Sequence, residues 1–130
     1  GRICLANWTP EGFVGQLFRT LGKHVPPAPG AKSPALWGTR DHMDALFGPN
    51  ADTIRFAERS FTFRYRSADH FIDVFRSYYG PVHKAFLALD ALGQSTLETD
   101  MTALLGQFNT ATDGTLQVPS AYIEVIVTKG

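Results

Sequence analysis

The feature that most constrains the fold is an apolar strand followed at once by a helix at the start of the sequence. Residues 2–6 (RICLA) form a short segment that is apolar on both faces, which is typical of a strand inside a layered sheet. Thr9-Pro10-Glu11 then has the residue types of a helix start, and apolar residues follow at helical spacing to a natural stop at Gly22. Because no other strand precedes this one, we expect its free edge to pair with a second copy or with another part of a longer protein.

Helices and strands continue to alternate along the rest of the chain. Four prolines within Lys23–Gly38 exclude regular structure and predict a long loop, a kind of segment that is often functional. Apolar residues alternate from Thr53 to Arg66, but their phase slips near Ala57-Glu58, which predicts a bulge or a bend there. The remaining predicted elements are a short helix after Thr39, a helix after Ser67 with a kink or restart at Gly80-Pro81, a helix opened by a capping box at Ser95, and a last strand from Leu116 to Thr128 with a break at Pro119.

These elements predict an α/β fold in a single domain over residues 1–130, which is long enough to bury a core. If the sheet repacks around its first strand, burying Ile3 and Leu5 in a different layer, the fold would be classed as α+β.

Charge and cysteine content argue against several kinds of partner. Twelve basic residues balance twelve acidic ones, so no field of one sign favours nucleic acid or an anionic membrane. No apolar run reaches the roughly 18 residues that are needed to span a bilayer. The single cysteine, Cys4, lies inside the apolar strand, where we expect a core residue, and the lack of any disulfide partner favours the cytoplasm.

No catalytic or metal motif is present in the sequence. It lacks a nucleophile elbow, a phosphate-binding loop and a glycine-rich turn after its first strand, and its four histidines do not have the spacing of a zinc site. His83 and Lys84 follow a proline kink among aromatic residues, so they are either ligand contacts or ordinary surface residues. At the carboxyl end of the first strand, where α/β sheets bind ligands, Asn7 could hold a polar group and Trp8 could stack on a ring. The alternative is that Trp8 packs against the proline-rich loop and Asn7 tightens the turn.

Four stretches of the sequence resemble one known family, the Rossmann-like S-adenosylmethionine-dependent methyltransferases, in the branch similar to the enzymes of ubiquinone and menaquinone biosynthesis. LANWTPEGFVGQLF resembles the fifth strand of that fold and the helix after it, while PALWGT, FRYRSADHFIDVFRSYYGPVHKAF and DGTLQVPSAYIEVIVTKG resemble the rest of its C-terminal half. The resemblance implies an incomplete doubly wound three-layer sandwich with about three strands of mixed direction and four to five helices, in which the last strand lies antiparallel between the other two. It also implies that the glycine-rich turn and the acidic residue that hold S-adenosylmethionine lie upstream, so we expect this chain alone to bind no cofactor.

In such enzymes this half mainly shapes the pocket for the methyl acceptor, a small molecule. The resemblance therefore makes five aromatic residues candidates for the walls of that pocket, and it assigns no catalytic residue: Trp8, Phe13, Trp37, Tyr78 and Tyr79. One alternative is a non-enzymatic binding or assembly module that forms a homodimer through its exposed strand edge. Another is an independent small-ligand enzyme that uses Tyr78, His83 and Lys84.

Overall fold

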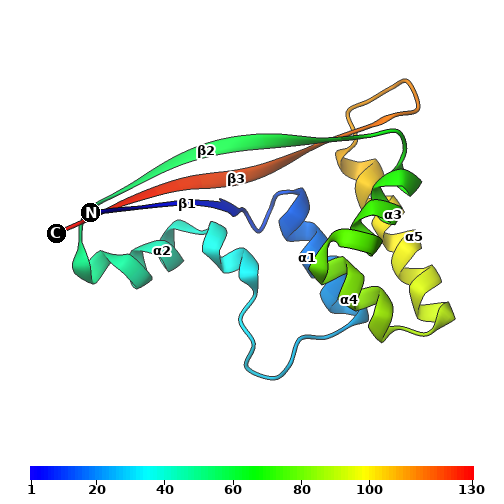
Figure 1. Ribbon diagram of the computed structural model, residues 1–130, viewed down its shortest axis with the longest axis horizontal. Coiled ribbons are helices and arrows are strands. Elements are labelled where there is room, and N and C mark those ends of the chain that lie inside the picture. The colour runs from blue at the N-terminus through cyan, green and yellow to red at the C-terminus, as the bar shows by residue number, and fades with distance from the viewer.

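A computed structural model describes all 130 residues of the chain, as a three-stranded sheet with five α-helices. The strands form one long arched sheet, with α2 near the end that carries both termini and the other α-helices gathered at the opposite end (Figure 1). This arrangement confirms the predicted mixture of helices and strands. The elements in chain order are β1 (Arg2–Trp8), α1 (Phe13–His24), the 3-10 helix η1 (Pro34–Gly38), α2 (Arg40–Phe47), the 3-10 helix η2 (Gly48–Asn50), β2 (Ala51–Tyr65), α3 (Ala68–Tyr78), α4 (Gly80–Ala88), α5 (Ala91–Phe108) and β3 (Leu116–Lys129).

The last strand lies in the middle of the sheet, whose order is β1-β3-β2. β3 pairs antiparallel with both neighbours, Arg2 lying opposite Thr128 on one side and Tyr65 opposite Leu116 on the other. The expected position of the last strand is therefore confirmed. The expected mixed strand direction differs in one respect: the outer strands run the same way but are separated by β3, so every hydrogen-bonded pair is antiparallel.

The register between β2 and β3 is continuous from Thr53 to Tyr65, and its only irregularity falls between Ala51 and Thr53. The bulge predicted near Ala57-Glu58 is therefore wrong. The change of hydrophobic phase that suggested it is nevertheless present, and packing explains it.

The two ends of the ribbon formed by β2 and β3 bury opposite faces. Ile54 and Phe56 pack against a small cluster that contains Met43 of α2, whereas Phe63 and Tyr65 pack against the main core. In an unbroken strand, even-numbered and odd-numbered residues point to opposite faces. Because a long two-stranded ribbon twists strongly along its length, both faces can turn toward helices that lie on one side of it in Figure 1.

Pro119 does not break the last strand, contrary to the prediction, and β3 runs through it. β1 pairs with β3 only from Tyr122 to Thr128, so at Pro119 the strand has β2 as its one neighbour. A proline, which lacks an N–H group, is tolerated where one edge of a strand is free.

β1 is an edge strand, as expected, but the expectation that it is buried on both faces is wrong. It pairs only with β3, Ile3 is 46% exposed, and Cys4 is exposed as well. Cys4 is therefore an exposed residue of an edge strand and not a core residue.

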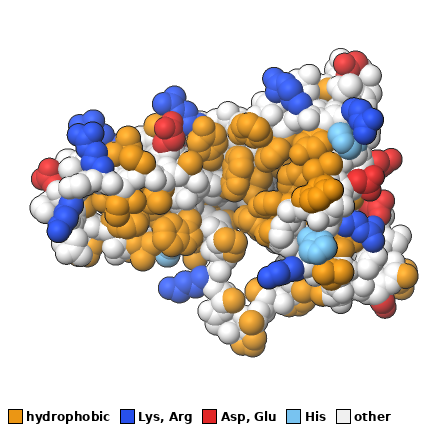
Figure 2. Space-filling view, viewed as in Figure 1, with side chains coloured by type: hydrophobic (Ala, Val, Ile, Leu, Met, Phe, Trp, Pro, Cys, Tyr) orange, Lys and Arg blue, Asp and Glu red, His pale blue; other side chains and the backbone are white.

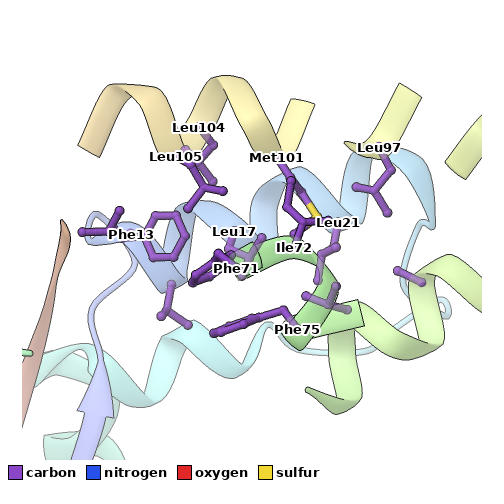
Figure 3. Packing of buried hydrophobic residues seen from close by; sticks show 14 of the residues in the cluster. Phe13, Leu17, Leu21, Phe71, Ile72, Phe75, Leu97, Met101, Leu104 and Leu105 are labelled. Atoms are coloured by element: carbon purple, nitrogen blue, oxygen red, sulfur yellow. The ribbon is translucent and has the colours of Figure 1, made fainter. Parts of the chain in front are cut away.

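The main core lies among the helices at the far end of the sheet. Figure 3 shows side chains of α1, α3 and α5 pointing toward one another. Two of its rings, Phe71 and Phe75, stack with their centroids 3.8 Å apart. The buried residues labelled there are Phe13, Leu17, Leu21, Phe71, Ile72, Phe75, Leu97, Met101, Leu104 and Leu105.

Helix boundaries follow capping residues, though not always the predicted ones. Ser67 caps α3 by accepting a hydrogen bond from His70 N–H at 3.1 Å, and the chain restarts as α4 at Gly80, as predicted. The capping box at Ser95 is wrong, because Asp90 caps α5 five residues earlier by accepting a 2.8 Å bond from Gly93 N–H. No helix of the chain has the length and apolar character needed to cross a bilayer.

Candidate functional site

The largest pocket, of about 820 Å³, lies between α1, α4 and the proline-rich loop that follows α1. Its volume falls within the range of small-molecule sites in proteins. The loop that the sequence marked as suspect therefore forms one of its walls. The lining residues that matter below are the apolar Phe18, Leu21, Val25, Pro27, Pro34 and Ala88, with Gly22, Arg19, Lys32 and Lys84.

The charges around this pocket are all of one sign. Arg19 of α1, Lys32 of the loop and Lys84 of α4 line it, and no aspartate or glutamate does. The two ion pairs of the chain, His24 with Asp100 and Arg59 with Glu124, lie elsewhere. On the face shown in Figure 2, basic side chains flank the projecting loop and no acidic side chain lies beside it.

Local hydrogen bonds and a glycine turn shape the proline-rich loop. Ala31 N–H donates to Ala28 O at 3.0 Å, and Gly30 between them has a positive φ of 80°, which favours glycine. Ser33 then caps η1 by accepting a hydrogen bond from Ala35 N–H at 3.2 Å. Prolines also restrict φ, so the backbone of this wall has fewer conformations to adopt than an ordinary loop.

The turn from β1 into α1 is fixed by hydrogen bonds to β3. Thr9 N–H donates to Ala121 O at 3.1 Å, and the Thr9 hydroxyl accepts a bond from Gly12 N–H at 3.2 Å. The helix begins at Phe13, not at Pro10 as predicted, and it ends at His24, beyond Gly22. The Thr9 hydroxyl therefore closes the turn instead of capping the helix.

The helix cap comes from a distant residue. Val14 N–H, at the start of α1, donates to the hydroxyl of Ser120 on β3 at 3.2 Å, and Ser120 is completely buried. Gly12, at the usual capping position, has no side chain to serve. The orphan N–H groups at a helix start need such partners, and here the sheet supplies one.

Two glycines allow close packing around this turn. A Cβ atom on Gly15 would lie 2.3 Å from Thr9 O, and one on Gly38 would lie 1.8 Å from Trp8 O. Both α1 and η1 thus pack directly against the backbone at the carboxyl end of β1. These two contacts fix α1 and η1, the elements before and after the proline-rich loop, against the end of β1.

The two candidates at the end of β1 point in different directions. The ring of Trp8 lies 5.7 Å from that of Phe63 and 5.8 Å from that of Tyr122, which makes it part of an aromatic cluster on the sheet. The amide nitrogen of Asn7 lies 3.9 Å from the sulfur of Met43, on the side of α2. Both side chains pack within the fold, but not as the alternative predicted: the rings around Trp8 belong to the sheet and not to the proline-rich loop, and Asn7 contacts α2.

The aromatic candidates do not form a common wall. Phe13 is completely buried in the core, so it cannot contact a ligand. Trp37 lies beside His42, with ring centroids 5.8 Å apart. Tyr78 is 85% exposed, whereas Tyr79 packs against Phe75, and burial raises the pKa of the Tyr79 hydroxyl.

His83 and Lys84 separate in the structure although they are adjacent in sequence. His83 Nδ1–H donates to Arg76 O at 2.8 Å, which ties α4 to α3. Lys84 is the one predicted site residue that lines the large pocket. Sequence reasoning missed Arg19 and Lys32, which are ordinary polar positions until folding brings a helix and a loop together; the loop composition was the only signal.

A second hollow, of about 690 Å³, lies over the end of β1 and is lined by Tyr122 of the aromatic cluster. Its charged groups are mixed in sign, since Glu11, Glu58 and Arg59 all line it. The Arg59 guanidinium is already paired with Glu124, whose hydrogen bond and charge raise the pKa of Arg59. This hollow is therefore less suited to a charged ligand than the pocket beside α4.

Comparison with known proteins gives relatives of greater length. No protein-family model matches the chain. Over 121 residues, which are 90% of this chain, it is 33% identical to the uncharacterized protein Rv1403c of Mycobacterium tuberculosis and to the uncharacterized protein Mb1438c of Mycobacterium bovis. Its identity to a second protein of M. tuberculosis, the uncharacterized protein Rv1405c, is 26% over the same length. The chain spans 43% of the length of each of these relatives.

Proposed function

We propose that this chain is the acceptor-side portion of an S-adenosylmethionine-dependent methyltransferase and is not catalytically complete alone. The observation that carries the proposal is the strand order β1-β3-β2, with the last strand antiparallel in the middle. The sequence resemblance implied this order, and the fold has it. The greater length of the mycobacterial relatives leaves room for the remaining part of such an enzyme.

In this proposal the methyl acceptor occupies the pocket between α1 and α4. The pocket has the volume of a small-molecule site, and prolines of the loop form part of its wall. Lys84, with the apolar side chains of both helices, would bind and orient the acceptor there. Positioning and exclusion of water are the main contributions that a protein makes to a displacement reaction of this kind.

The residues of this chain do not fit a cofactor site at the turn after its first strand. The N–H groups of Thr9 and Gly12, which a glycine-rich turn would offer to a ligand, are already bonded to Ala121 O and to the Thr9 hydroxyl. S-adenosylmethionine, which would supply the methyl group, must then be held by the part of the relatives that this chain does not span. The cytoplasm is the compartment that we propose, since a single exposed thiol such as Cys4 persists in a reducing environment.

Calorimetric titration with S-adenosylmethionine tests this proposal on two proteins. The full-length M. tuberculosis relative Rv1403c should bind the cofactor, and this chain alone should not. If the relative fails to bind, the methyltransferase proposal is wrong. If this chain alone binds with micromolar affinity, the proposed division between cofactor side and acceptor side is wrong.

The exposed edge of β1 favours a second candidate, an assembly module that forms a homodimer. Ile3 is about half exposed on a strand whose outer edge has no partner within the chain, and unpaired edges template pairing with another strand. Light scattering should then give twice the chain mass, and Ile3→Lys should restore the monomer. A monomer at high protein concentration would rule out this candidate.

A further inference from the structure

We infer that the pocket between α1, α4 and the proline-rich loop binds an apolar molecule that carries a single negatively charged head group, such as a carboxylate. Binding itself is a property of this chain's own residues. Only the identification of this ligand with the methyl acceptor rests on the proposed function.

The sign of the head group follows from the uncompensated charge of the pocket. The chain as a whole has equal numbers of acidic and basic residues, yet three basic side chains and no acidic one line this pocket. Arg19, Lys32 and Lys84 take part in neither of the chain's ion pairs. An exposed pair is weak, because water and salt screen it, but three cations around one opening select the sign of a ligand.

The apolar part of the ligand is inferred from the side chains that line the pocket. On one side the pocket is lined by Phe18 and Leu21 of α1 and by Val25, which directly follows that helix. Ala85 and Ala88 of α4 line it as well. Burial of apolar surface would supply most of the affinity. The cations would then orient the ligand, with its head group toward the opening.

The same walls argue against nucleotide phosphates. Phosphate sites rely on free backbone N–H groups at a helix start or in a glycine-rich turn. The α4 start that borders this pocket carries Pro81, which has no N–H, and the loop wall includes Pro27 and Pro34. Recognition of an anion here would therefore depend on the side-chain charges of Arg19, Lys32 and Lys84 and not on backbone N–H groups.

Titration with three probes of equal chain length tests the charge preference. Decanoate, decanamide and decylamine are added to this chain at low ionic strength, below the critical micelle concentration, and binding is measured by calorimetry. Decanoate should bind about tenfold more tightly than decanamide, which corresponds to about 1.4 kcal/mol, and decylamine should bind least. Added salt should reduce the difference between decanoate and decanamide.

Two kinds of variant locate the site. Arg19→Gln, Lys32→Gln and Lys84→Gln combined should abolish the preference for decanoate while decanamide still binds. The matched control combines Arg64→Gln, Arg66→Gln and Lys129→Gln, three exposed cations that do not line the pocket, and it should keep the preference.

Gly22→Leu blocks the pocket without endangering the fold. Gly22 is a residue of α1 that lines the pocket, and a Cβ atom on it would meet nothing within 4 Å. Leucine is the better helix former, so stability should hold or rise. Binding of both decanoate and decanamide should fall at least tenfold.

Three results would each overturn the inference: equal affinity for decanoate and decanamide, an unchanged preference in the triple pocket variant, or no binding of either probe to the wild-type chain. None of them affects the methyltransferase proposal, which is tested by cofactor binding to the longer relative. Conversely, failure of the relative to bind S-adenosylmethionine would leave the pocket's ligand preference standing and remove only its role as acceptor.

Discussion

Replacing Ser120 by alanine removes the hydroxyl that caps α1 from the neighbouring sheet. Its partner, Val14 N–H, donates to it at 3.2 Å, and Val14 is only 1% exposed, so water cannot take the place of the hydroxyl. A buried donor left without a partner costs about 1–3 kcal/mol, and loss of a helix N-cap costs about 0.5–2 kcal/mol. The two costs describe the same hydrogen bond, so they are not added. The variant also has no polar hydroxyl to bury, which offsets part of the cost. We therefore expect Ser120→Ala to lower the free energy of unfolding by about 1–2 kcal/mol.

Urea denaturation followed by circular dichroism measures this change. The midpoint should fall while the dependence on urea concentration stays constant, because the surface exposed on unfolding does not change. The melting temperature should fall by about 4–8 °C for a domain of this size. Ser60→Ala, at an exposed position on the adjacent strand β2, is the matched control and should stay within about 0.5 kcal/mol of wild type. If Ser120→Ala lowers the free energy of unfolding by less than about 0.5 kcal/mol, the hydrogen bond from Val14 to Ser120 does not stabilise α1 as we expect.

Three further predictions concern other parts of the chain. Gly15→Ala should destabilise the protein by about 1–3 kcal/mol in urea denaturation, since its Cβ would lie 2.3 Å from a backbone oxygen, whereas Gly22→Ala, with open space around it, should stabilise α1 by up to about 1 kcal/mol. Burial raises the pKa of Tyr79 above its ordinary value. The contribution of its neutral form to stability is therefore complete below about pH 10 and is lost as pH rises through the folded pKa. Relative to wild type, Tyr79→Phe should gain stability only in alkaline denaturation curves. Hydrogen bonds from the side chain and backbone of Thr115 lower the pKa of Asp113, so its stabilising contribution is present above about pH 4 and is lost as pH falls through the folded pKa; Asp113→Ala should flatten the acid limb of the stability profile, and an unchanged limb would contradict this.

Local features of the sequence predicted those parts of the fold that local interactions decide. Ser67 caps the helix after it, and the Gly80-Pro81 pair ends one helix and starts another, because a hydroxyl and a proline ring act within a few residues of the backbone. Where two local signals competed, the sequence misled, since Asp90 and Ser95 both have the residue type of a cap and only the first serves as one.

The candidate site depended more heavily on tertiary structure. Of the residues singled out in the sequence, Lys84 lies in the large pocket, while Phe13 lies in the core and Trp8 in a cluster on the sheet. Aromatic composition could not distinguish these positions, because a ring favours a core and a ligand pocket for the same reason, its apolar surface.

The sequence by itself indicated most of the helices and strands, although it missed the 3-10 helix at Pro34–Gly38, and through the resemblance it also indicated where the last strand inserts. Tertiary structure alone decided that Ile3 and Cys4 of β1 are exposed and not buried, that Ser120 caps a helix 106 residues away, and that Arg19 and Lys32 meet Lys84 around one pocket. The physical reason is the distance along the sequence over which each kind of interaction acts. Propensity, capping and periodicity act over a few neighbouring residues, whereas burial, pairing and charge clustering depend on which distant segments the packed chain brings together.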